Sequence, residues 1–415
     1  MRYVPVPDDA VNAFFATAYE RAPAVRRLLD AAGLDPRALP PPAQWLERLP
    51  VMTKEELSAR QQAEPPFGGW VAGGVQAVRR VFVSPGPIYN VEGTEPDDWG
   101  TAEAVRAAGF GPGDLVLNTF SYHLSPASFM VESGLRAVGA AVIPAGTAAK
   151  AEQVRLLRQL PVTGYAGVPS YLKALLDELA ASGEPQPGGG SGRPAALPLR
   201  RAWLAAERLP EELRREFQER WGIEAYQGYG TAEVGIVAFE CTVRQGWHLG
   251  GRAVVEILDP ETRRPVPEGE TGEVVVTPLR AAYPLLRLAT GDLSRVLPGA
   301  CPCGRRSPRL AGVLGRVGSG VKVRGMFVYP HQIEELARAV PGIARLVARV
   351  SQENYRDWLE LAAEPAGEGP GERETELARR LEEAARDRLR LRPDAVRVVG
   401  PGQLAGQPLL ADQRR

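Results

Sequence analysis

The sequence predicts an α/β protein with a large N-terminal domain of mixed and parallel sheets, a small barrel-like β part, and a small C-terminal α+β domain. Strands alternate with helices from about residue 100, the hydrophobic period changes to two after residue 240, and a separate set of helices and strands follows Gly320. A chain of 415 residues is also too long for one hydrophobic core. We therefore expect two domains, residues 1–317 and 318–415.

The beginning of the chain is expected to be helical. Residues 10–60 have the pattern of helices that are broken at Pro36 and at the run Pro40–Pro42. Thr53-Lys54-Glu55-Glu56 is typical of the start of a further short helix.

The central part alternates between short apolar runs and amphipathic segments. The expected strands are Asp114–Phe120, Ala140–Ile143, Val162–Tyr165, Arg201–Leu204 and Glu224–Tyr229. The expected helices are Ser125–Val138, Ala148–Leu160, Pro169–Ala181 and Glu211–Trp221. This order predicts a parallel sheet with helices on its faces. The Gly-, Pro- and Ser-rich segment Ser182–Pro198 predicts a surface loop.

The last third of the chain predicts two further structures. Ala253–Leu258 and Gly272–Pro278 alternate around a turn-rich segment, as in an antiparallel hairpin or a small barrel. The small domain is expected to contain the helices Pro330–Ala339 and Arg373–Arg390 and the strands Ala344–Ser351, Trp358–Ala363 and Ala395–Val399.

The composition is that of an ordinary globular protein, with 44% hydrophobic and 24% charged residues. Fifty basic residues balance fifty acidic ones, so no overall field favours nucleic acid or a membrane as a partner. Residues 1–10 contain no apolar leader, and with three cysteines the chain is expected in the reducing cytoplasm. The sequence leaves open whether the chain forms a homodimer. Lysine is rare beside arginine, and the four lysines are Lys54, Lys150, Lys173 and Lys322.

All three cysteines can join one histidine in a metal site. Cys241 and His248 are seven positions apart, and Cys301-Pro302-Cys303 forms a tight turn in a loop. Three thiolates and one imidazole suit a closed, tetrahedral zinc site that joins two loops and does no chemistry. The alternative is that these are unrelated buried cysteines.

Two motifs near the predicted strand ends suit a nucleotide. In Tyr226–Glu233, glycines permit close approach of backbone amides to a phosphate, Thr231 offers a hydroxyl, and Glu233 could hold Mg²⁺. Asp292, in Ala289-Thr290-Gly291-Asp292, could accept both hydroxyls of a ribose. A plain strand-end turn and a turn-stabilising aspartate are the alternatives.

A third motif and an aromatic segment complete the candidate site. Gly315-Arg316 and Val321–Gly325 lie where the large domain gives way to the small one. Phe120, Tyr122 and His123 follow a predicted strand at the carboxyl edge of the sheet, where they could line a carboxylate pocket. For His123 an ordinary surface or core histidine is an equal alternative.

These motifs, in this order and spacing, resemble those of the adenylate-forming (acyl-CoA synthetase) superfamily, and most closely the phenylacetate–coenzyme A ligases. The family carries Tyr-Gly-x-Thr/Ser-Glu, Thr-Gly-Asp and Gly-Arg…Lys-x-Arg-Gly motifs, and Cys-Pro-Cys-Gly-Arg between the last two, as stands at Cys301–Arg305. The resemblance implies a ligase that uses ATP, Mg²⁺ and coenzyme A. An aryl or small acyl carboxylate would form an acyl-adenylate, from which a coenzyme A thiol displaces AMP.

The resemblance also implies roles for individual residues. Thr231, Glu233 and Lys322 would be catalytic, with Glu233 as the Mg²⁺ ligand. The small domain would rotate about a hinge near Gly318–Lys322. Nucleotide contacts would come from Ala206, Glu207, Tyr229, Gly230, Thr231, Asp292, Arg316, Arg324 and Gly325.

Two departures from the family pattern concern positive charge. The loop that usually ends in Gly-Lys-Pro is here Val83–Tyr89, without lysine, and no lysine follows Lys322. Because such cations stabilise the transition state of adenylation, we expect that step to be slow. The alternative function is a nucleotide- or acyl-adenylate-binding homologue without adenylation lysines, and a third is transfer to an acceptor other than coenzyme A.

Overall fold

The computed structural model divides into two compact units, Met1–Gly315 and Arg316–Arg415. It describes residues 2–3, 5–84, 87–181, 197–317, 320–328, 330–366 and 372–414. The predicted hinge at Gly318 and most of the predicted loop Ser182–Pro198 lie outside these ranges. Within them, no helix combines the length and the apolar composition that crossing a bilayer requires. The mixed α/β class predicted from the sequence is confirmed.

A nine-stranded sheet forms the centre of the large unit. Its strand order is β14-β15-β10-β9-β8-β7-β6-β4-β5. The strands from β5 to β8 are parallel, and β9 runs antiparallel to β8. In chain order these strands are β4 (Leu115–Asn118), β5 (Ala141–Pro144), β6 (Gly164–Gly167), β7 (Arg201–Leu204), β8 (Glu224–Thr231), β9 (Gly235–Glu240), β10 (Trp247–Leu249), β14 (Val296–Leu297) and β15 (Arg309–Leu310).

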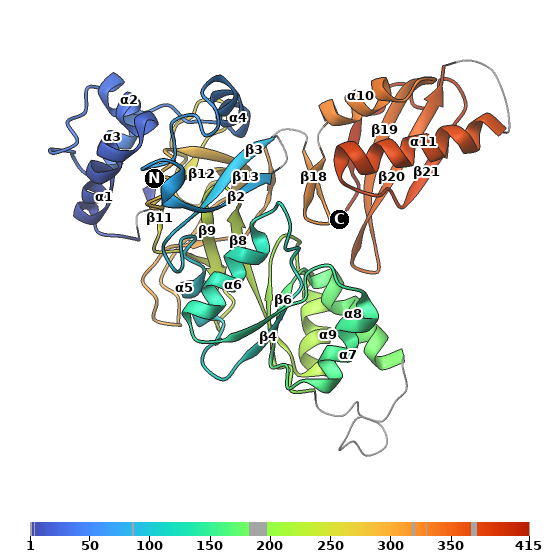
Figure 1. Ribbon diagram of the computed structural model, residues 1–415, viewed down its shortest axis with the longest axis horizontal. Coiled ribbons are helices and arrows are strands. Elements are labelled where there is room, and N and C mark those ends of the chain that lie inside the picture. Colours follow the sequence, from blue (N-terminus) through green and yellow to red (C-terminus); the bar gives the residue numbers. More distant parts are fainter. Residues whose placement is uncertain are drawn as a thin grey trace. The chain divides into compact units, whose positions relative to one another are not determined.

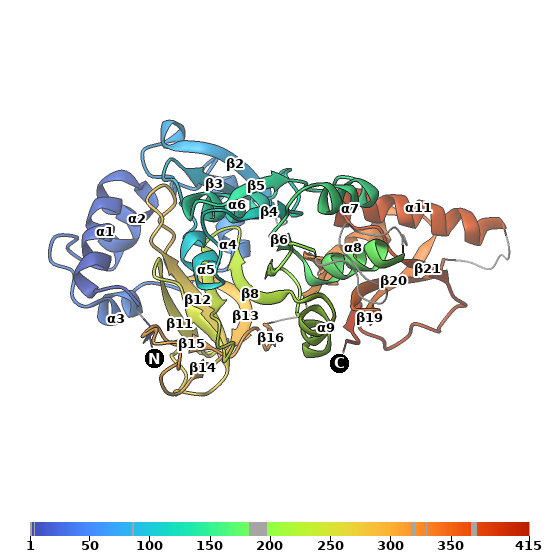
Figure 2. The same cartoon turned by 90° about the horizontal axis from the view of Figure 1, so that it is seen from below.

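Helices cover this sheet because the segments between its parallel strands are amphipathic. The helices are α5 (Thr101–Ala107), α6 (Ala127–Ala137), α7 (Lys150–Gln159), α8 (Pro169–Ala181) and α9 (Glu211–Trp221). In Figures 1 and 2, α5 and α6 lie to one side of the strands, and α7, α8 and α9 lie to the other. The carboxyl ends of the parallel strands therefore share one edge, as doubly wound sheets require.

A second, antiparallel sheet follows where the hydrophobic period changes to two. Its order is β1-β11-β12-β13-β16, from the strands β1 (Arg2–Tyr3), β11 (Ala253–Leu258), β12 (Gly272–Pro278), β13 (Leu288–Ser294) and β16 (Gly315–Arg316). The predicted hairpin is confirmed by the register Val255↔Val276. The part expected to be barrel-like is an open sheet in the described residues.

The N-terminal helices and a hairpin pack beside this second sheet. The helices are α1 (Asp8–Arg21), α2 (Pro23–Ala31), α3 (Pro42–Trp45) and α4 (Lys54–Ala63). The strands β2 (Val78–Ser84) and β3 (Ile88–Gly93) form an antiparallel hairpin that the sequence analysis did not predict. Phe15, Trp45, Val91 and Leu285 all contribute to one buried core, which joins these segments to the β13 region.

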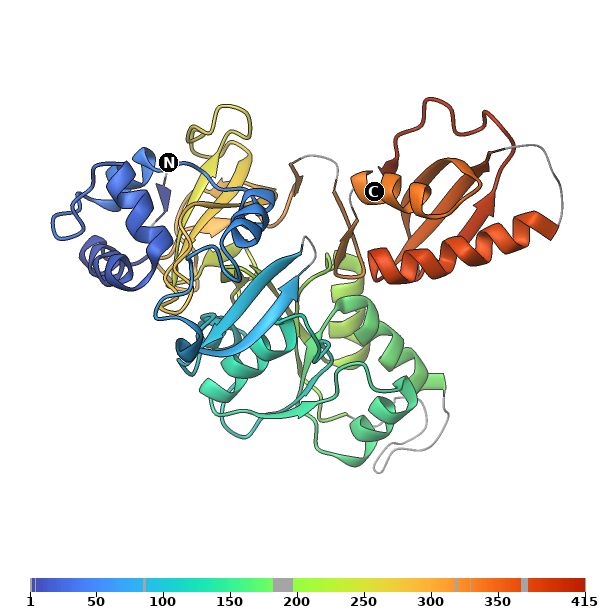
Figure 3. The same ribbon diagram turned by 45° about the horizontal axis from the view of Figure 1, so that its top comes forward.

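The small unit has its own core and its own sheet. The sheet order is β21-β20-β19-β22, and α10 (Pro330–Ala339) and α11 (Glu372–Leu389) lie side by side on it (Figure 3). The strands are β19 (Ile343–Glu353), β20 (Arg356–Pro365), β21 (Ala395–Val398) and β22 (Leu410–Asp412), with a separate hairpin of β17 (Val321–Val323) and β18 (Met326–Val328). Buried Ile333, Leu361 and Leu381 belong to this core.

Candidate active site

Two of the predicted nucleotide motifs meet in the structure. Tyr229, near the end of β8, donates a hydrogen bond of 2.9 Å from its hydroxyl to Asp292 Oδ2 on β13. The same hydroxyl lies 3.1 Å from Thr290 Oγ1, which in turn accepts from the Asp292 amide at 3.1 Å. Asp292 is only 7% exposed, so these bonds fix the orientation of its carboxylate. The hydrophobic pattern alone could not predict this contact between two sheets.

The glycines of the β8 motif permit close packing. A Cβ on Gly228 would lie 1.9 Å from Trp203 Cζ2, and one on Gly230 would lie 2.5 Å from the carbonyl oxygen of Gly235. A side chain at either place would push β8 away from its neighbours. These two glycines are therefore explained by packing as well as by the predicted approach of a phosphate.

Glu233 lies in the turn between β8 and β9 and is almost fully buried. Its side chain is 2% exposed, and the Lys54 ammonium is 3.1 Å from its Oε2. Its Oε1 accepts a hydrogen bond of 3.3 Å from Ser84 Oγ. Burial acts to raise the pKa of Glu233, but the positive charge of Lys54 and nearby hydrogen bonds outweigh it, so this pKa is lowered. The carboxylate is therefore held ionised.

Lys54 is the residue at this site that the sequence analysis missed. It was identified only as part of a helix start, and α4 does begin at Lys54, after a capping box between Thr53 and Glu56. Its rarity was the available signal, because a lysine in such an arginine-rich chain is unusual. The fold brings it to Glu233, which is 179 positions away in the sequence.

The backbone of the β8–β9 turn is fixed by a buried arginine. Arg280 donates a hydrogen bond of 2.9 Å to the backbone oxygen of Glu233 and another of 3.2 Å to Asp98 Oδ2. Arg280 and Asp98 are each 1% exposed at the side chain. This pair holds the turn against β3, because Arg280 also bonds the Val91 carbonyl at 2.5 Å.

Two other predicted nucleotide contacts lie at strand ends. Ala206, after β7, has a φ of +70°, and the next residue, Glu207, accepts a hydrogen bond of 2.6 Å from Ser170 Oγ. Arg316 belongs to β16, the strand next to β13. The carboxyl end of β7 and the strand beside Asp292 thus carry polar groups, as predicted, whereas their nucleotide roles remain predictions.

The predicted aromatic pocket is divided in the structure. Phe120 is buried in the core around α5 and α6, whereas His123 is exposed. The Tyr122 hydroxyl accepts a hydrogen bond of 2.8 Å from Asn118 Nδ2, and its ring meets the Phe129 ring edge-on with centroids 5.2 Å apart. Burial, and then hydrogen bonding with Glu132, raise the pKa of Tyr122, so it stays protonated. A shared substrate role for the three residues remains a prediction.

The predicted motif of the small unit lies on the β17–β18 hairpin. Lys322 is in β17, and Arg324 and Gly325 form the turn with φ values of +47° and +84°. The Arg324 amide donates to Asp357 Oδ2 at 2.8 Å, and Arg414 donates to the Lys322 carbonyl at 2.7 Å. Hydrogen bonds between the backbone of the hairpin and the side chains of Asp357 and Arg414 thus hold it in place.

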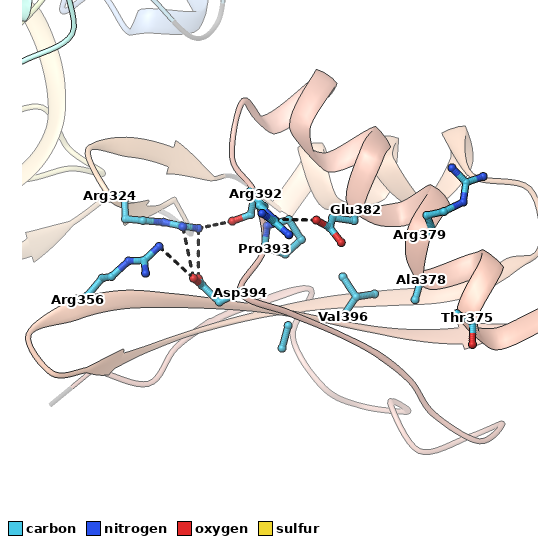
Figure 4. A pocket seen from close by; sticks show the side chains of 11 residues that line it. Arg324, Arg356, Thr375, Ala378, Arg379, Glu382, Arg392, Pro393, Asp394 and Val396 are labelled. Carbon is cyan, nitrogen blue, oxygen red and sulfur yellow. Dashed lines mark hydrogen bonds and ion pairs between the residues drawn. The ribbon is translucent and has the colours of Figure 1, made fainter. Parts of the chain in front are cut away.

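A cavity of about 560 Å³ lies within the small unit between α11 and β21 (Figure 4). Its four arginines are Arg324, Arg356, Arg379 and Arg392. Each of them has a carboxylate partner within 3.4 Å, because Asp394 pairs with the first two and glutamates of α11 pair with the others. The cavity therefore has little free positive charge for an anion.

The predicted metal ligands converge. The ligand atoms of Cys241, His248, Cys301 and Cys303 all lie within 4.8 Å of one another, from β9, β10 and the loop before β15. The Sγ atoms of Cys241 and Cys301 are 3.7 Å apart, and Cys303 Sγ is 3.3 Å from His248 Nε2. His248 Nδ1 is 3.2 Å from the Ser307 carbonyl oxygen, which orients the ring. Burial lowers the pKa of His248, so its ring is neutral.

Comparison with known proteins gives three findings. The AMP-binding enzyme family model matches residues 99–278. The chain is 32% identical to a phenylacetate-coenzyme A ligase of Thermus thermophilus over 86% of this chain and 80% of the relative, and 30% identical to that of Aromatoleum evansii over 84% and 78%. It also resembles the crystal structure of a 2-hydroxyisobutyryl-CoA ligase with 2-HIB-AMP and CoA in the thioesterification state. That likeness has a TM-score of 0.85 and 26% identity, and covers 98% of this chain and 90% of the other.

Proposed function

Because the chain belongs to the AMP-binding enzyme family and is of the phenylacetate–coenzyme A ligase type, we propose that it is an acid–thiol ligase that forms AMP. It activates an aryl or small acyl carboxylate with ATP and transfers the acyl group to coenzyme A. The observation that carries this proposal is the hydrogen bond between Tyr229 and Asp292 at the carboxyl end of β8, the strand that leads into the turn of the buried Glu233. The carboxyl edge is where doubly wound sheets bind nucleotides.

The residues of this edge suit the two ends of a nucleotide. Asp292 is held by Tyr229 with carboxylate oxygens that can accept from both ribose hydroxyls. Thr231 and the amides near Gly230 suit the α-phosphate. The ionised, buried Glu233 offers the hard oxygen ligand that Mg²⁺ prefers, and the metal would neutralise phosphate charge there.

The reaction proceeds in two displacements. A carboxylate oxygen attacks the α-phosphorus of ATP, the bond from that phosphorus to the bridging oxygen breaks, and the electron pair leaves with pyrophosphate. The coenzyme A thiolate then attacks the acyl carbonyl, and AMP leaves. Lys322, Arg324 and Gly325 of the small unit serve the second step, in keeping with the family motif that they match.

A pyrophosphate-release assay tests this function. Purified protein is incubated with ATP, Mg²⁺ and a panel of aryl and short-chain carboxylates, with and without coenzyme A. We expect pyrophosphate with at least one acid and a coenzyme A thioester when the thiol is present. ATP or acyl-adenylate binding without any turnover would instead support a binding homologue. Pyrophosphate without thioester would indicate a different acceptor.

The cysteine–histidine cluster is best explained as a structural zinc site. Cys241, His248, Cys301 and Cys303 supply a closed set of three sulfurs and one nitrogen, so no position is left for substrate. Zinc there would join β9 and β10 to the loop before β15. Metal analysis of protein purified without chelator should give about one zinc per chain, with sulfur distances of ~2.3 Å by X-ray absorption. A content far below one, or unchanged content in Cys303→Ser, would contradict the site.

A further inference from the structure

Lys54 is paired with Glu233, in the turn between β8 and β9. Its ammonium is 3.1 Å from Glu233 Oε2, and the other oxygen of this carboxylate bonds Ser84 at 3.3 Å. Ser84 is the last residue of β2, and the sequence that follows it up to Tyr89, which the family resemblance aligns with a phosphate loop, contains no lysine. The Lys54 ammonium is thus held beside a carboxylate that also bonds the last residue of β2.

The backbone around Lys54 is fixed from both sides. Before it, Met52 donates from its amide to the Arg287 carbonyl at 3.0 Å and accepts from Ala289 at 2.8 Å, so it adds to β13, the strand of Asp292. After it, Gln61 of α4 exchanges two hydrogen bonds of 2.8 Å with the backbone of Tyr89 on β3. The helix that carries the ammonium is therefore anchored to both walls of the site.

Charge compensation of a buried carboxylate would explain the contact only in part. Glu233 needs a counter-charge because its side chain is 2% exposed. The Lys54 side chain, however, is 18% exposed, so Lys54 is the more accessible partner of the pair. An ammonium has three donors, and a bond to Glu233 leaves two for other oxygens. The other lysines of the large unit, Lys150 and Lys173, pair with acids on α8 and α9.

We propose that Lys54 is a catalytic residue of adenylation that contacts the phosphates of ATP. This inference rests on the proposed function. As the carboxylate oxygen bonds to the α-phosphorus and the bridging bond breaks, negative charge grows on the departing pyrophosphate. The Lys54 ammonium stabilises that charge without giving up a proton, and so replaces the absent loop lysine. In the second step the electron pair of the broken acyl–oxygen bond leaves with AMP and no pyrophosphate is present, so an ammonium that serves the departing pyrophosphate matters far less there.

The test separates the two half-reactions in the full chain. One assay follows pyrophosphate release from ATP and phenylacetate, or the best acid of the panel. The other follows thioester formation from synthetic phenylacetyl-adenylate and coenzyme A. The variants are Lys54→Met, Lys54→Gln, which keeps a donor for Glu233, and Lys54→Arg, which keeps the charge. Lys150→Met is the matched control, because Lys150 also begins a helix and pairs with a glutamate at 2.9 Å.

We expect Lys54→Met and Lys54→Gln to slow pyrophosphate release by about 100-fold or more, while thioester formation changes less than about threefold. Lys54→Arg should recover most of the loss, and Lys150→Met should match the wild type. Equal loss in both assays, or no loss in either, would overturn the role of Lys54. A wild-type protein that is inactive in both assays would overturn the proposed function itself. The variants, by contrast, test only the role of Lys54.

Discussion

At the scale of single residues, the candidate site is built from a few buried polar groups with defined partners. Tyr229 orients Asp292, Lys54 holds Glu233 ionised, and Arg280 fixes the backbone of the turn between β8 and β9. The motifs predicted Tyr229, Glu233 and Asp292 because their residue types and order are visible in the sequence. Lys54 was not predicted, since its partner is distant in sequence and only the packing of α4 on β3 and β13 joins them.

Replacing the predicted ribose acceptor should weaken nucleotide binding. Asp292→Ala removes a charged acceptor and leaves the Tyr229 hydroxyl without its 2.9 Å partner. We expect AMP and ATP affinity to fall by about 2 kcal/mol in titration calorimetry, the scale of a lost hydrogen bond to a charged group. Asp259→Ala, in the β11–β12 turn, is the control. Equal affinities for Asp292→Ala and the wild type would remove Asp292 from the nucleotide site.

The stability of the protein in acid should depend on Glu233. Its pKa in the folded state lies below the ordinary value of 4.5, so its ionised form stabilises the fold above that pH. This stabilisation is lost as the pH falls through the folded-state pKa. As the pH falls below about 4.5, urea unfolding should therefore show a larger loss of stability for the wild type than for Glu233→Gln. Identical pH dependence would mean that Lys54 does not lower this pKa.

At the scale of elements, the strands and helices with a clear period were predicted well. The expected helix Arg373–Arg390 is α11, Glu372–Leu389, and the expected strand Asp114–Phe120 is β4, Leu115–Asn118. The β2–β3 hairpin was missed because Val83–Tyr89 was interpreted as a loop motif, and its prolines obscured the strand pattern. The edge strand β22 is three residues long, too short to show a period.

The capping box of α4 should matter for both stability and activity. Thr53 accepts from the Glu56 amide at 3.2 Å, and Glu56 accepts from the Thr53 amide at 2.8 Å. Thr53→Ala should reduce the stability of the large unit by about 1 kcal/mol. Because it also loosens the turn that carries Lys54, pyrophosphate release should fall more than thioester formation. Thr17→Ala, on the exposed face of α1, controls for a general loss of threonine. Parallel losses in both half-reactions would contradict a positioning role for this cap.

At the scale of the whole molecule, each of the two units contains hydrophobic clusters of its own. In the large unit one cluster extends from the N-terminal helices to β13 and another surrounds α5 and α6, whereas in the small unit a cluster lies among α10, α11 and the sheet. The expected domains, residues 1–317 and 318–415, came from the change of hydrophobic period and from a helix–strand set of about 95 residues with its own apolar faces. The contacts among the candidate site residues, by contrast, join segments of the large unit that are 63 to 182 residues apart, and no local pattern encodes them.

The large and the small unit should unfold in two separate calorimetric transitions. Leu381, on α11, and Leu285, before β13, are each fully buried in a different core. Replacing either leucine by alanine removes buried apolar surface and leaves a cavity, which should lower the free energy of unfolding by about 2–5 kcal/mol. Leu381→Ala should lower the melting temperature of the small-unit transition alone, and Leu285→Ala that of the large-unit transition alone. ATP should raise the melting temperature of the large-unit transition alone, since ligand binding stabilises the unit that holds most of the candidate nucleotide-binding residues. A single transition that both variants shift equally would show that the two cores unfold as one cooperative unit.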